Sequence, residues 1–65
     1  MAKIWEPQLI HVYQAWVNTI IDEAQDKLSE WESGFVDSIN QQLDKNRNLS
    51  QKQAEILERI YSEKT

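Results

Sequence analysis

The sequence predicts a small all-α protein whose three helices form an up-down-up bundle. Only one glycine and one proline occur among 65 residues, so the chain lacks the turn residues that strands and hairpins need. Apolar residues recur at steps of three and four, which is the period of a helix that buries one face. A serine followed three residues later by Glu or Gln occurs at Ser29 and again at Ser50. This pattern is the capping box that starts many helices.

The first helix is expected at about residues 7–26. Pro7 suits a first helical turn because its missing N–H would be unpaired there anyway. From Leu9 to Ala24 the apolar residues cover more than half of the helix circumference. Two neighbouring helices leave part of so broad a face uncovered, which favours a homodimer through this helix as one hypothesis.

The second and third helices are expected at about residues 30–44 and 51–63, which makes 28–61 a capped helical hairpin. In a capping box the serine oxygen accepts the N–H of the third helical residue, whose side chain returns to the serine N–H. Glu32 is the expected return partner of Ser29, and Gln53 that of Ser50. Short polar connections favour antiparallel neighbours.

The turn between these helices is polar and contains two asparagines, which tolerate the left-handed backbone found at helix ends. Leu49 and Ala54 occupy the positions of a hydrophobic staple across the start of the third helix. Glu55 and Arg59 have the spacing and order of a favourable ion pair on that helix.

Composition indicates a single acidic domain, residues 1–65, with a basic end. The formal net charge is −4. Residues 1–44 hold two lysines against eight carboxylates, a net charge of −6, whereas residues 45–65 hold five basic side chains against three carboxylates, a net charge of +2. Non-specific DNA binding by the whole surface is therefore not expected, while a local contact at the basic end stays open.

A cytoplasmic protein is expected. The chain has no cysteine, which fits a reducing compartment. Polar residues interrupt the N-terminal apolar positions, so neither a signal peptide nor a membrane span is expected.

No enzymatic activity, metal, cofactor or small-molecule substrate is expected. His11 is the only histidine, and no nucleophile and base have a third residue to orient them. A lone histidine with scattered carboxylates is a poor set of metal ligands. We interpret His11 as a helix-surface residue.

The aromatic residues have two interpretations. Trp16, Trp31 and Phe35 are expected in the core, because a chain this short needs large buried side chains. Trp5 precedes the first helix and is equally compatible with packing and with anchoring a partner, a role in which Trp is enriched. The candidate partner contacts are Trp5, Val12 and Trp16. Gly34, inside the second helix, indicates close packing of another helix or of a tryptophan.

Lys45, Arg47 and Lys52 form the one basic cluster of the chain. They surround a helix N-terminus, where free N–H groups and the helix dipole favour phosphate. One interpretation is a contact with nucleic acid, and the other is a solvated loop that balances an acidic body.

The capped hairpin resembles a short pattern in small phage and bacterial proteins of DNA metabolism. The matching residues are Leu28, Ser29, Trp31, Glu32, Phe35 and Val36, followed by Leu49, Ser50, Lys52, Gln53, Ile56, Leu57 and Ile60. The hairpin is similar to the small helical module encoded beside the recombination helicase of T-even phages. That module in turn resembles the helicase-associated nucleic-acid-binding bundle of the RecQ class. The resemblance implies a helical bundle with a role in DNA replication, recombination or repair, and nucleic-acid contacts at Lys52 and the adjacent basic turn.

Two functions are therefore expected as alternatives. The first is a non-enzymatic, phage-type accessory protein of DNA metabolism that acts through protein partners and touches nucleic acid weakly. The second is a pure protein-protein module, an inhibitor or adaptor, that presents an acidic face and a Trp-rich helix to a basic partner.

Overall fold

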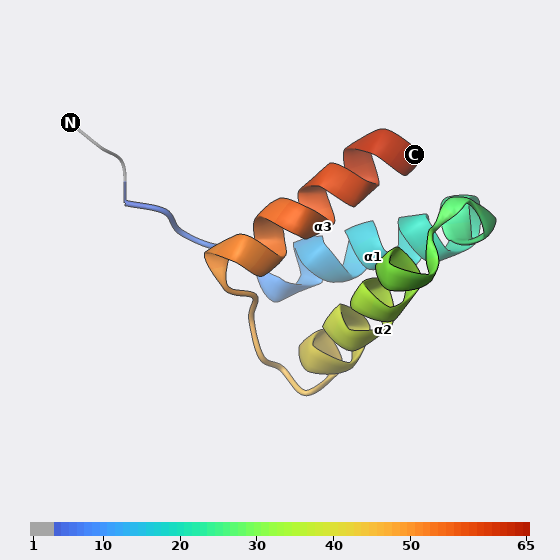
Figure 1. Ribbon diagram of the computed structural model, residues 1–65. Coiled ribbons are helices and arrows are strands. Elements are labelled where there is room, and N and C mark those ends of the chain that lie inside the picture. Colours follow the sequence, from blue (N-terminus) through green and yellow to red (C-terminus); the bar gives the residue numbers. More distant parts are fainter. Residues whose placement is uncertain (1–3) are drawn as a thin grey trace.

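Three α-helices and a short 3-10 turn make up the fold in the computed structural model (Figure 1). The structure describes residues 4–65, so the first three residues of the chain lie outside it. Helix α1 spans Ile10–Ala24, the turn η1 spans Gln25–Lys27, α2 spans Glu30–Asp44 and α3 spans Gln51–Lys64. Helix α2 runs opposite to α1 and α3 (Figure 1). Helix α1 packs against both other helices, which contact each other less. The predicted all-α bundle is confirmed.

Helix α1 begins at Ile10, three residues later than expected, and Pro7 lies before it. Tertiary hydrogen bonds of the Gln8 backbone explain this later start. The Gln8 N–H donates to the Tyr13 hydroxyl at 3.0 Å, and the Gln8 carbonyl accepts from the Asn48 side-chain amide at 2.9 Å. These bonds hold the Gln8 backbone outside the helix, and the N-cap Leu9 has extended backbone with no side-chain cap. At the other end, the expected terminus near residue 26 falls in η1.

Both predicted capping boxes are confirmed. The Ser29 hydroxyl accepts the Glu32 N–H at 3.1 Å, and the Glu32 carboxylate accepts the Ser29 N–H at 2.9 Å. At the start of α3 the corresponding distances between Ser50 and Gln53 are 3.3 and 3.0 Å. Each box satisfies backbone donors that have no partner inside the helix. Local sequence therefore fixes where α2 and α3 begin.

A left-handed asparagine ends α2. Asn46 has a φ of 61°, and its N–H donates to the Leu43 carbonyl at 2.9 Å. The Arg47 N–H donates to the Gln42 carbonyl at 3.1 Å. These two bonds form a Schellman motif, with asparagine in the position that glycine usually occupies. The expected helix end is confirmed.

The core is built mainly from aliphatic side chains on all three helices. The buried residues are Tyr13, Val17, Ile20, Ala24, Val36, Ile39, Leu43, Leu49, Ala54, Leu57 and Ile60. Both members of the predicted staple are among them. Trp16 and Phe35 are half-buried and pack against this cluster.

The expectation that Trp31 lies in the core is wrong, because 62% of this residue is exposed. Trp31, Phe35, Ile39 and Leu43 follow one another at steps of four, and each such step turns the seam by about 40°. Three steps carry Trp31 roughly 120° from Leu43, whereas Val36, Ile39 and Leu43 share the buried face. Trp31 is therefore exposed because the seam has rotated away from the buried face.

Gly34 is not a site of close packing, which corrects a second expectation. A methyl group at its Cα would meet no other residue within 4 Å. The ion pair expected between Glu55 and Arg59 is also replaced, since the Arg59 Nε lies 3.6 Å from a Glu63 carboxylate oxygen.

We expect Gly34→Ala to raise the free energy of unfolding by about 0.5–1 kcal/mol, because alanine loses less backbone entropy on folding and its methyl group has free space. Urea denaturation of both proteins measures the change. Ala15→Gly, at an exposed position of α1, should lower the free energy of unfolding by a similar amount. It serves as the reference for the size of an alanine-to-glycine difference in this protein. Unchanged or lower stability in Gly34→Ala would mean that the surroundings of Gly34 are tighter than the structure indicates.

We expect Ser29→Ala and Ser50→Ala each to lower stability by about 1 kcal/mol through loss of the cap. Ser38→Ala, on the exposed side of α2, removes a hydroxyl without removing a cap and should leave stability unchanged or slightly higher. Thermal unfolding followed by circular dichroism compares the three variants. A melting curve of Ser50→Ala that matches the wild type would show that this box does not start α3.

Candidate functional site

The three cations of the predicted nucleic-acid site lie at one end of the bundle. Lys45 and Arg47 are on the α2–α3 connection, Lys52 is in the first turn of α3, and all three are exposed. We call them the basic turn. None of them forms an ion pair with a carboxylate of residues 4–65. They are therefore available to an anionic group, and contact with nucleic acid stays a prediction.

A network of side-chain amides stiffens the basic turn. The amides of Gln42 and Gln53 bond to each other reciprocally, at 3.3 and 3.1 Å. Gln42 also donates to the Asn48 carbonyl at 2.7 Å. The Gln53 oxygen that closes the capping box of α3 is the same atom that accepts from Gln42. This end of α2 is thereby tied to the start of α3.

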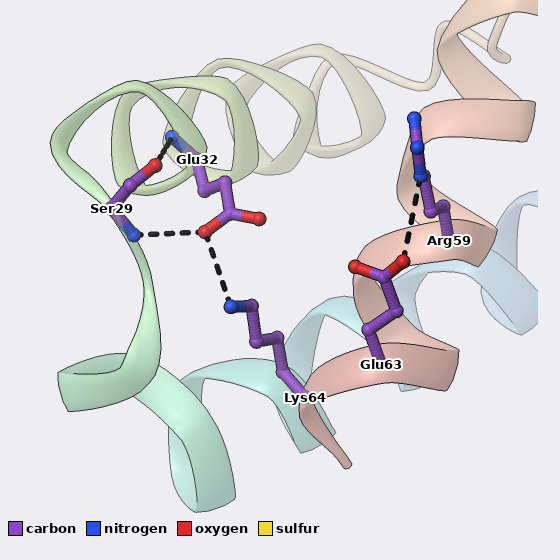
Figure 2. A network of polar contacts seen from close by, with 5 residues as sticks. All are labelled: Ser29, Glu32, Arg59, Glu63 and Lys64. Atoms are coloured by element: carbon purple, nitrogen blue, oxygen red, sulfur yellow. Dashed lines mark hydrogen bonds and ion pairs between the residues drawn. The ribbon is translucent and has the colours of Figure 1, made fainter.

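The opposite ends of α2 and α3 are joined by Glu32 and Lys64, whose charged atoms lie 3.7 Å apart (Figure 2). The Ser29 N–H, with Lys64 nearby, holds the pKa of the Glu32 carboxyl below its ordinary value of 4.5. The ionised form of Glu32 thus stabilises the fold fully above that value, and its contribution is lost as pH falls through the lowered pKa. The cap of α2 is for this reason sensitive to acid.

Beside the tie between Glu32 and Lys64, α2 and α3 leave a groove with a volume of about 450 Å³. It is lined by Ser29, Trp31, Glu32, Ile56, Arg59, Ile60 and Glu63. Trp31 stacks on Phe35 beside it, with ring centroids 5.4 Å apart and an interplanar angle of 12°. We call this pair the aromatic ledge. Figure 2 shows Arg59 and Glu63 on α3 near this opening, across from Glu32 on α2.

The aromatic ledge is the feature that sequence reasoning missed, because Trp31 and Phe35 were both expected in the core. The signal was present in their spacing. An unbroken step of four leaves the buried face of a helix, while the alternation of three and four stays on it.

A second hollow lies where the segment before α1 meets α1 and α3. It is lined by Trp5, Glu6, Gln8, Tyr13, Trp16, Ala54, Glu55 and Glu58. Two of the three predicted partner contacts, Trp5 and Trp16, are brought together here. The third, Val12, is half-buried and does not line the hollow. Contact of these residues with a partner, like the homodimer through the first helix, stays a prediction.

His11 is exposed on α1. Among the described residues no three His, Cys, Asp or Glu side chains come close enough to hold a metal ion. Within residues 4–65 no helix is both long enough and apolar enough to cross a bilayer.

Comparison of the chain with protein-family models, with curated proteins and with solved structures finds no match.

Proposed function

We propose that the chain is a non-enzymatic, phage-type accessory protein of DNA replication, recombination or repair that acts by binding a protein partner. The aromatic ledge is the surface that we assign to this contact. The alternative, a pure inhibitor or adaptor, would also require a protein partner but no role in DNA metabolism.

The exposure of Trp31 is the observation that carries the proposal. An indole that is 62% exposed leaves a large apolar surface in water, on a capped helix and beside a groove. Trp is enriched among the few residues that supply most of the binding energy of protein interfaces. Stacking on Phe35 holds the ring in place, so little side-chain entropy is lost when a partner covers it.

The context of DNA metabolism rests on the resemblance of residues 28–61 to the helicase-associated helical module. Trp31 and Phe35 belong to the matching pattern and form the aromatic ledge. Phe35 packs against the core, whereas Trp31 is 62% exposed, so core packing does not account for the tryptophan. The same pattern includes Ser29, Glu32, Ser50 and Gln53, whose presence the capping boxes explain.

We expect Trp31→Ala to lose the partner while the fold persists, because the side chain is mostly exposed and its removal should change stability by less than about 1 kcal/mol. The wild type and the variant serve as bait in a lysate of the native host, and mass spectrometry identifies the retained proteins. Leu9→Ala, at an apolar residue that is 67% exposed and distant in sequence from the ledge, is the control.

A replication, recombination or repair protein retained by the wild type and by Leu9→Ala, but lost by Trp31→Ala, supports the proposal. Equal retention by all three baits would remove the aromatic ledge from the contact. Retention of partners unrelated to DNA would favour the inhibitor or adaptor.

Direct contact with DNA through the basic turn is the second candidate, favoured by three exposed cations without ion-pair partners. The surrounding acidic body limits its strength, so we expect binding to single-stranded or branched DNA only at low salt.

We expect the double charge reversal Arg47→Glu, Lys52→Glu to abolish this binding, because two phosphate contacts become repulsive. Fluorescence anisotropy with labelled DNA over a range of salt concentrations measures the affinity and its salt slope. Lys27→Glu, at an exposed cation of η1, should leave the slope unchanged. Failure of the wild type to bind at low salt would exclude direct contact and leave the protein partner as the only route to DNA.

A further inference from the structure

The hollow beside the N-terminal segment combines aromatic walls with unpaired carboxylates. Trp5 and Trp16 supply the aromatic walls, whereas Tyr13, which also lines the hollow, is only 2% exposed; we call this site the Trp5 hollow. Its volume is about 200 Å³, which exceeds several times the roughly 30 Å³ that one water molecule takes up in the liquid. A small organic group therefore fits. The Trp5 hollow shares no lining residue with the groove beside the aromatic ledge, so it stands independently of the function proposed above.

The walls of the Trp5 hollow are held in place before any ligand arrives. The two hydrogen bonds of the Gln8 backbone tie the segment that carries Trp5 to α1 and to the α2–α3 connection. Trp16 has two aromatic neighbours, Tyr13 in a T-shaped contact at 5.3 Å and 75°, and Tyr61 in a stacked contact at 5.3 Å and 16°. Such preorganisation reduces the entropy lost on binding.

The electrostatics of the hollow favour a cation. Glu6, Glu55 and Glu58 line it, and among residues 4–65 no Lys, Arg or His does. None of these carboxylates forms an ion pair within residues 4–65, since Arg59, the partner expected for Glu55, turns to Glu63 instead. The faces of aromatic rings carry partial negative charge and attract cations further.

We infer that the Trp5 hollow binds the alkylammonium group of an organic cation, such as the trimethylammonium head of a small amine or of a methylated lysine side chain. Aromatic walls match the apolar methyl groups of such a cation, and the carboxylates match its charge. A metal ion does not fit equally well, because the carboxylates do not converge as metal ligands.

Two-dimensional NMR of the indole N–H groups tests the site, because the chain has only three tryptophans and each gives one signal. Choline and the amide of acetyl-trimethyllysine are titrated as the two sources of the ammonium group. Dimethylbutanol, in which a carbon atom replaces the choline nitrogen, is the uncharged control, and sodium chloride controls for ionic strength. We expect the Trp5 and Trp16 signals to shift with millimolar affinity for the cations, while Trp31 serves as an internal reference.

The double variant Glu55→Gln, Glu58→Gln should bind about tenfold more weakly or worse, because it removes charge but not shape. Glu23→Gln, Glu30→Gln changes the net charge equally at exposed residues outside the hollow, and its affinity should match the wild type. Trp5→Ala should also lose binding, and unchanged signals of Trp16 and Trp31 in the free variant would show that it remains folded.

Tighter binding of choline or of the lysine derivative identifies the source of the natural ligand, and either result supports the site. Three outcomes would overturn it. These are no shift of Trp5 and Trp16 with either cation, equal shifts with dimethylbutanol, and equal weakening by the two double variants.

Discussion

Glu32 and Gln53, the third helical residues of the two capping boxes, each make one contact within their own helix and one contact with the other helix. Each side chain returns to its serine N–H and also reaches across to the other helix, Glu32 to Lys64 and Gln53 to Gln42. Helices α2 and α3 contact each other less than either contacts α1. Their relative placement consequently depends on these two polar ties, one at each end, as well as on their common packing against α1. The residues that start the two helices thus also join one helix to the other.

The surface between α2 and α3 is open at one end. There the groove beside the aromatic ledge lies between the first turn of α2 and residues 56–63 of α3, next to the tie between Glu32 and Lys64. The buried core is supplied by α1 with one face of each neighbour. A 65-residue chain with so small a core has little stability to lose, so the loss of one cap or one core side chain is a large fraction of the total.

The helix termini that depend on local capping residues could be predicted from the sequence. The features that depend on tertiary contacts could not. The starts of α2 and α3 follow from serine and its third neighbour, and the end of α2 follows from an asparagine that accepts left-handed backbone. The start of α1 was displaced because Gln8 bonds to Tyr13 and Asn48, and Asn48 is 40 residues away. Arg59 likewise had an acidic side chain within reach on either side, and only the structure distinguishes Glu55 from Glu63.

The candidate sites also divide into one that could be predicted from the sequence and two that only the structure shows. Lys45, Arg47 and Lys52 are close in sequence, so their proximity could be predicted. The Trp5 hollow joins residues 5 and 6 to residues 55 and 58, a meeting that periodicity does not encode. Trp31 is exposed because steps of four residues gradually rotate around the helix, away from its buried face. A count of apolar residues at helical spacing does not include this rotation and therefore predicts that Trp31 is buried.

The hydrogen bond between Asn48 and Gln8 joins the connection that carries the basic turn to the segment that carries Trp5. Asn48 directly follows Arg47, three residues before the start of α3 at Gln51, and Gln8 lies three residues from Trp5. A ligand that moves either segment therefore also strains or breaks the hydrogen bond that joins it to the other segment. By thermodynamic reciprocity, an anion at the basic turn and a cation at the Trp5 hollow would alter each other's affinity by the same factor. If both proposed ligands bind, the hydrogen bond from the Asn48 amide to Gln8 is the contact through which the two sites would be coupled.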